Sequence, residues 1–173
     1  MGNSSSVAQI IALCEEYVKL TAIRVRLFAS PLRLIYNKVV IIDLSSLEQA
    51  VDRLGEILER YGKEAQDLAV QDSVVQRFEY TYELAYKTLK RFLEMTSANP
   101  AEIDVMSFQE LIRTGNEKGL LKSRADTWLS YRDKRNMTSH TYDSTKAGEV
   151  ISIAPKFYEE AKHLLERIKE RNA

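Results

Sequence analysis

The chain has 173 residues, of which 45% are hydrophobic and 29% are charged, and its 25 basic and 25 acidic residues cancel. This composition is typical of one folded domain and excludes a disordered chain. The zero net charge excludes a protein that coats nucleic acid over its whole surface, although a local basic site is still possible. The single cysteine, Cys14, cannot form an internal disulfide, and the sequence has no Cys/His cluster with zinc-site spacing. Because no apolar run reaches the roughly 18 residues of a membrane span, we predict a cytoplasmic protein without metal, cofactor or membrane contact.

The first part of the chain differs from the rest. It is apolar but irregular, and Ser30-Pro31 interrupts it. We therefore assign residues 1–43 to an N-terminal extension of unknown role and residues 44–173 to a helical domain. We expect the domain to stay folded when the extension is removed.

From Leu44 onward, apolar residues recur at the three- and four-residue spacing of amphipathic helices. The first such stripe consists of Leu47, Val51, Leu54, Leu58 and Tyr61. Gly62 is a residue that can close this helix. Ser73 and Gln76 have the spacing of a capping box, which predicts a second helix from there to about Met95.

Asn99-Pro100 predicts a loop after the second helix. Ser107 and Glu110 form another capping-box pattern, which predicts a short helix that ends before Gly119. These signals place one short helix between the long ones.

Ser123 and Asp126 predict the start of a further helix, and a last helix should run from near Ser144 to about Arg171. Pro155 should kink this last helix or mark its effective start. The fold class is therefore all-α: an antiparallel four-helix bundle with one extra short helix. Large side chains on the second helix exceed what one thin bundle would bury, so we predict a homodimer; they are Phe78, Tyr82, Tyr86 and Phe92.

A locally basic stretch follows in the predicted fourth long helix. Residues 122–140 hold five basic residues against two acidic ones, which suits a phosphate ligand. Arg132, Asn136 and His140 are four residues apart and share one face of a continuous helix. Arg135 is about 140° from His140 on an ideal helix, but the two could border one groove if the helix ends near Ser139.

Such residues could cleave a phosphodiester. A histidine moves protons near neutral pH, and an arginine pairs with phosphate oxygens. RNA supplies its own nucleophile, the 2′-OH, so no metal is required. The alternative is a surface histidine near a helix end with solvated arginines, and spacing alone favours this alternative.

The motif also resembles that of a known family. Residues 135–140, Arg-Asn-Met-Thr-Ser-His, match the Arg-x4–6-His signature of the HEPN superfamily, and Arg135-x4-His140-x-Tyr142 is similar to the motif of HepT-type toxins. Residues 76–90 and Trp128-Leu129 resemble the nucleotidyltransferase substrate-binding proteins. The resemblance covers roughly residues 44–171, whereas the extension and residues 96–106 depart from the family pattern.

The resemblance implies a dimeric four-helix bundle that acts as a metal-independent ribonuclease toxin on RNA. Arg135 would stabilise the scissile phosphate, and His140 would be the general acid or base. The implied partner is an MNT-type nucleotidyltransferase antitoxin, which would transfer AMP to Tyr142. An added anion beside the catalytic histidine would then block RNA.

Other residues could support the cleft. We expect Asn136, Arg132 and Glu79 to hold its geometry. Glu79 and Glu83 could contact the cleft arginines from the second helix, although a solvated or capping role is equally compatible with their positions. A different class of function also stays open, namely a non-catalytic substrate-binding subunit of a two-component nucleotidyltransferase, because it needs the same basic cleft.

Overall fold

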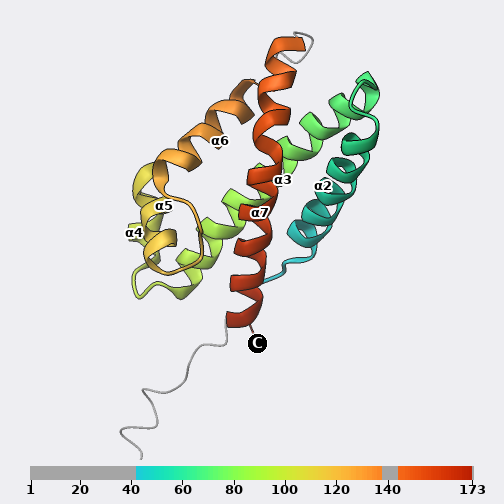
Figure 1. Cartoon of the computed structure of the whole chain (residues 1–173). Helices are drawn as coiled ribbons and strands as arrows, with labels where there is room; N and C mark the ends of the chain where they lie inside the picture. Colours follow the sequence, from blue (N-terminus) through green and yellow to red (C-terminus); the bar gives the residue numbers. More distant parts are fainter. Residues whose placement is uncertain (1–41, 138–143, 173) are drawn as a thin grey trace, which may run out of the picture. The chain divides into compact units, whose positions relative to one another are not determined.

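The computed structural model describes residues 42–137 and 144–172, and all of these belong to the second of the two compact units of the chain, residues 40–173 (Figure 1). The described residues form six α-helices and no strand: α2 (Ser45–Lys63), α3 (Leu68–Thr96), α4 (Pro100–Asp104), α5 (Phe108–Glu117), α6 (Ala125–Met137) and α7 (Ser144–Arg171). The prediction of an all-helical fold is confirmed. In these ranges no helix is long and apolar enough to cross a membrane.

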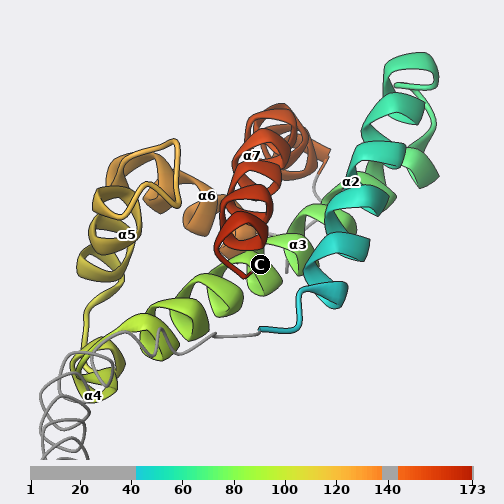
Figure 2. The same cartoon turned by 90° about the horizontal axis from the view of Figure 1, so that it is seen from below.

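The two longest helices, α3 and α7, form the centre of the bundle. α2 and α3 make an antiparallel hairpin through a short loop, and α7 crosses α3 (Figure 1). Figure 2 shows α7 end-on above α3, between α2 on one side and α5 and α6 on the other. α3 contacts all five other helices, so a side chain on it can meet residues from both sides of the bundle.

The predicted start of the second helix is wrong. α3 begins at Leu68, and Asp67 is its N-cap, with Oδ1 accepting hydrogen bonds from Ala69 N at 2.8 Å and Val70 N at 3.4 Å. Ser73 lies inside the helix, where its hydroxyl donates to Ala69 O at 2.7 Å. A serine in a helix can satisfy its hydroxyl in this way, so a Ser-x-x-Gln pattern also fits a helix interior.

The capping box predicted for α5 is confirmed. Ser107 Oγ accepts a hydrogen bond from Glu110 N at 3.4 Å, and Glu110 Oε2 accepts one from Ser107 N at 2.8 Å. The neighbouring Ser107 groups hold the pKa of the Glu110 carboxyl below its usual value. The box therefore fixes the first residue of α5, Phe108.

The two prolines of the helical domain had different predicted roles. Pro100 begins the five-residue helix α4 instead of lying in a plain loop, because its missing N–H and fixed φ suit the first turn of a helix. The last helix runs from Ser144 to Arg171 as predicted, with Pro155 inside it. Pro155 therefore does not mark the start of the helix, and the alternative, a kink at Pro155, stays a prediction.

The core is centred on aromatic rings from three helices. Phe157 of α7 lies 5.2 Å from Phe78 and 5.2 Å from Tyr131 between ring centroids, and Trp128 packs edge-on against both Tyr131 and Phe157. The Trp128 side chain is fully buried. These contacts join α3, α6 and α7 into one core.

The bundle buries by itself most of the side chains that suggested a dimer. Phe78, Tyr82 and Phe92 are buried within one chain, and Tyr86 is half-buried. Their size therefore gives no argument for a second copy.

The core begins before residue 44. Ile42 is buried, its N–H donates to Asn172 Oδ1 at 2.9 Å, and its carbonyl accepts from Asn172 Nδ2 at 2.9 Å. Removal of the extension with retention of the fold stays a prediction, and the truncated chain should start at Val40 so that Ile42 is kept.

Candidate functional site

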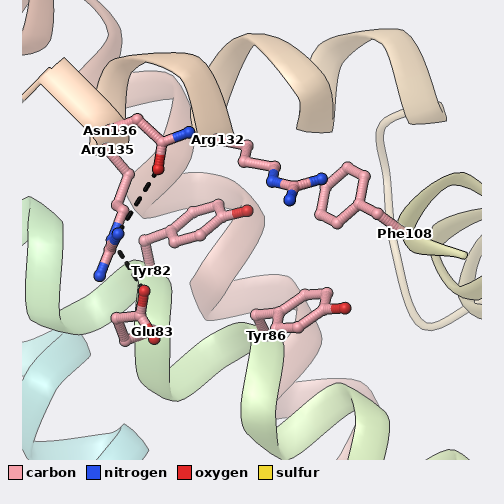
Figure 3. A pocket seen from close by; sticks show the side chains of 7 residues that line it. All are labelled: Tyr82, Glu83, Tyr86, Phe108, Arg132, Arg135 and Asn136. Carbon is pink, nitrogen blue, oxygen red and sulfur yellow. Dashed lines mark hydrogen bonds and ion pairs between the residues drawn. The ribbon is translucent and has the colours of Figure 1, made fainter. Parts of the chain in front are cut away.

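A pocket of about 220 Å³ lies where α3, α5 and α6 converge (Figure 3). Three helices supply its lining: Tyr82, Glu83 and Tyr86 from α3, Phe108 from α5, and Arg132, Arg135 and Asn136 from α6. Both guanidinium groups and the aromatic rings therefore border one small space.

A buried carboxyl group from α7 fixes the start of α6. Glu160 is 2% exposed, and its Oε1 accepts hydrogen bonds from Lys122 N at 2.9 Å, Ser123 N at 3.3 Å and Trp128 Nε1 at 3.4 Å. The three donors belong to the α5–α6 connection and the first turn of α6. Glu160 thus sets the position of the helix that carries the arginines.

Glu160 was not among the residues predicted from the sequence. It lies in a highly charged helix, where a glutamate is normally solvated. One signal was available: Glu160 is three residues after Phe157 and four before Leu164, so it lies on the apolar stripe of the helix.

Arg135 is held by a carboxylate of α3. Arg135 Nε lies 2.7 Å from Glu83 Oε1, and Arg135 Nη1 donates to Asn136 Oδ1 at a long 3.4 Å (Figure 3). The Arg135 and Glu83 side chains are 34% and 33% exposed, so solvent screens the ion pair and its contribution to stability is about 1 kcal/mol or less. The main consequence of the pair is the orientation of the guanidinium at the pocket.

Arg132 meets an aromatic ring instead of a carboxylate. Its Cζ lies 4.7 Å from the centroid of the Phe108 ring, within cation–π range. The Phe108 ring is stacked on Tyr86, with 5.5 Å between centroids and 26° between planes. Among the described residues, no carboxylate oxygen lies within 4.0 Å of the Arg132 guanidinium.

Tyr82 forms the buried side of the pocket. Burial raises the pKa of its phenol, an effect that the nearby Arg132 and Arg135 only partly oppose. The phenol therefore stays protonated at neutral pH, where it can donate a hydrogen bond but cannot act as a general base.

The pocket brings together some of the predicted site residues and not others. Arg132, Arg135 and Asn136 line it together. Glu83 makes the contact with Arg135 that was considered for it, whereas Glu79 is half-buried one turn earlier and is not in the lining. The motif residues His140 and Tyr142 lie outside the described residues.

Two lining residues were not expected at the site. Tyr86 was named only among the large side chains that suggested a dimer, and Phe108 had no predicted role. A signal existed for Phe108, because a residue directly after a capping-box serine has a fixed place at a helix start. Its ring partners come from distant segments, however, and no local pattern identifies them.

The basic stretch is divided between several environments. Lys134 pairs with Glu149, and Lys122 Nζ lies 3.8 Å from Glu159 Oε2. Arg124 lines a different cavity, together with Arg113 and Asp126. The expected phosphate-binding patch is therefore reduced to Arg132 and Arg135 at the pocket. In the described part of the chain, no group of three or more His, Cys, Asp or Glu residues could hold a metal ion.

Comparison with known proteins gives consistent matches over the helical domain. Residues 42–170 match the family described as "Nucleotidyltransferase substrate binding protein like". The "Probable ribonuclease HepT" of Haemophilus influenzae is 37% identical over 131 residues, which are 73% of this chain and 87% of that protein.

Two solved structures are similar as well. A Haemophilus influenzae protein, described as showing the fold of a substrate-binding domain of a nucleotidyltransferase, has a TM-score of 0.68 and 30% identity over 73% of this chain and 99% of its own. A Thermus thermophilus protein has a TM-score of 0.57 and 28% identity over 70% of this chain and 97% of its own. The chain therefore belongs to the family of nucleotidyltransferase substrate-binding-like proteins.

Proposed function

We propose that this chain is a metal-independent ribonuclease of the HEPN type, the toxin of a toxin–antitoxin pair. The observation that carries the proposal is the placement of Arg135, which Glu83 holds at the pocket five residues before His140. The similarity to a protein named as a probable ribonuclease HepT supports the same activity.

The reaction needs only the substrate and two side chains. The 2′-oxygen of RNA attacks the adjacent phosphorus, the 5′-oxygen leaves, and the product ends in a 2′,3′-cyclic phosphate. His140 takes the proton of the 2′-OH or gives one to the leaving oxygen, and water takes part in the other proton transfer. Arg135 binds the phosphate and stabilises the charge of the transition state.

Regulation would act on the same motif. In this proposal a cognate MNT-type nucleotidyltransferase transfers AMP to Tyr142, two residues beyond His140, and the added anion repels the phosphates of RNA. Mass spectrometry of the co-expressed pair should show adducts that disappear in Tyr142→Phe. Adducts that persist in this variant would place the acceptor elsewhere.

The catalytic step is tested by cleavage of a labelled RNA in EDTA. His140→Ala should lower the cleavage rate by about 10²–10⁴-fold, the usual contribution of a general acid or base, with a much smaller loss of RNA binding. Arg135→Ala should weaken both binding and cleavage, because it removes a phosphate contact in the ground state and the transition state. Equal cleavage by wild type and His140→Ala would contradict the proposal.

A second function is favoured by a separate observation. The family description and one similar structure refer to substrate binding for a nucleotidyltransferase. In that case the pocket would present a nucleotide or another phosphorylated ligand without cutting RNA. Growth separates the two functions: toxicity that His140→Ala abolishes supports the nuclease, and harmless expression with tight nucleotide binding supports the binding subunit.

We further propose that the active form is a homodimer with the Arg135 and His140 side chains of each protomer near the interface. The family resemblance supports this assembly. The large side chains do not, because the bundle buries most of them itself. Light scattering at micromolar concentration should give twice the mass of the chain, and a monomer would contradict the dimer.

A further inference from the structure

One wall of the pocket has no role in phosphate chemistry. It consists of the stacked Phe108 and Tyr86 rings, with the Arg132 guanidinium over Phe108 (Figure 3). Phosphate binding and proton transfer require neither ring. The presence of two aromatic side chains beside two arginines therefore needs its own explanation.

Core packing does not fully explain this wall. Tyr86 and Phe108 are only half-buried and Arg132 is exposed, in contrast to the buried rings of Phe78 and Trp128. The capping box of α5 also fixes the backbone at Phe108, so the ring is held in place at the surface. Such an arrangement is preorganised for a flat ligand.

The geometry points to a nucleobase subsite on this wall. One base would stack on the planar guanidinium of Arg132, which lies over the Phe108 ring, and against the neighbouring Tyr86 ring. Bases stack on aromatic and arginine planes in this way in single-strand binding proteins. Its attached phosphate would meet Arg132 and Arg135. The inference rests on the proposed function in taking RNA as one source of the base, but it also applies to a free nucleotide.

The size and polarity of the pocket fit one base. A volume of about 220 Å³ is below the range of pockets for drug-sized ligands, which begins near roughly 300 Å³, so the space suits a single ring system. Asn136 is exposed in the lining and carries both a donor and an acceptor for the edge of a base. Tyr82 can donate a further hydrogen bond from the buried side, since its raised pKa keeps the hydroxyl protonated.

Fluorescence of 2-aminopurine, which stacking quenches, tests the subsite. The full-length His140→Ala chain is titrated into a short single-stranded RNA that carries one 2-aminopurine, so that binding is measured without cleavage. The variants Phe108→Leu and Tyr86→Leu keep apolar volume but remove a ring. The controls are Phe108→Tyr, which keeps a ring, and Tyr61→Leu, which removes a partly buried ring on α2 away from the pocket.

We expect quenching with the parent chain, with Phe108→Tyr and with Tyr61→Leu. Phe108→Leu and Tyr86→Leu should lose the quenching and bind the RNA about fivefold or more weakly, the lower end of what one stacked base contributes. Matching circular dichroism spectra and melting curves show that the variants are folded. Equal quenching and affinity in all variants, or no quenching with the parent chain, would overturn the subsite.

Two further measurements complete the test. One distinguishes RNA from a free nucleotide as the source of the base, and the other distinguishes the base subsite from the nuclease proposal. Displacement of the RNA by AMP but not by ribose 5-phosphate supports a base-dependent site that also accepts a free nucleotide. Displacement by RNA alone supports the subsite with RNA as its source, and equal displacement by AMP and ribose 5-phosphate overturns it. Base-dependent binding in a chain whose wild type does not cleave RNA would support the subsite while contradicting the nuclease.

Discussion

Two carboxyl groups hold the two ends of α6, and their surroundings differ. At the start of the helix, Glu160 is almost completely buried and accepts hydrogen bonds from two backbone N–H groups and an indole N–H. Near the end, Glu83 is one-third exposed and faces the guanidinium of Arg135. The same side-chain chemistry thus serves stability where water is excluded and serves the site where water and a ligand can enter.

The larger effect is expected at the buried end. Glu160→Leu should lower the free energy of unfolding by about 3 kcal/mol, because three donors lose their acceptor and the indole N–H of Trp128 stays buried. Urea unfolding followed by circular dichroism measures the loss. The matched control is Glu159→Leu at the exposed neighbouring position, which should change the stability by less than about 1 kcal/mol.

Glu160→Gln tests whether Glu160 stabilises the fold by accepting hydrogen bonds. Its amide oxygen can still accept hydrogen bonds, so this variant should be more stable than Glu160→Leu. If Glu160→Leu and Glu159→Leu had the same free energy of unfolding, the buried carboxyl group of Glu160 would not stabilise the protein more than an exposed one.

The smaller effect is expected at the exposed end, and in function instead of stability. Glu83→Gln should tighten RNA binding by roughly threefold, because it removes a negative charge that competes with phosphate for Arg135 and a screened pair is worth under about 1 kcal/mol. The cleavage rate at saturating RNA should fall, because the guanidinium is no longer held in one orientation. Separate measurement of kcat and KM detects the expected result, namely tighter binding together with a lower kcat.

Glu79→Gln is the control for the change of charge. It removes the same charge from α3 one turn away, at a residue outside the pocket lining, so RNA binding and cleavage should stay close to wild type. Equal effects of Glu79→Gln and Glu83→Gln would mean that only the overall charge of α3 matters, and the ion pair with Arg135 would have no special role.

The sequence predicted the helices better than the contacts between them. Apolar periodicity and capping patterns depend on one helix at a time, so together they located α2, α5, α6 and α7. It could not choose between Glu79 and Glu83, because residues four apart share a helical face and only the path of α6 decides which one meets Arg135.

The family motif and the pocket wall also show that single residues are easier to predict from the sequence than the contacts between them. The resemblance identified Arg135, and the structure supplied the partner and the pocket around it. Phe108 and Tyr86 meet through tertiary packing of α5 on α3, which no local pattern encodes. The roles of His140 and Tyr142 stay predictions.

The side-chain amide of Asn172 joins the beginning and the end of the helical bundle. This one side chain donates to and accepts from the backbone of Ile42, as a paired strand would, so the first and last described residues of the bundle are adjacent. A short linker between positions 42 and 172 would therefore permit a circular permutant with new ends in the loop between α2 and α3. The order of the helices along the chain could then be changed while the α6 pocket keeps all its parts.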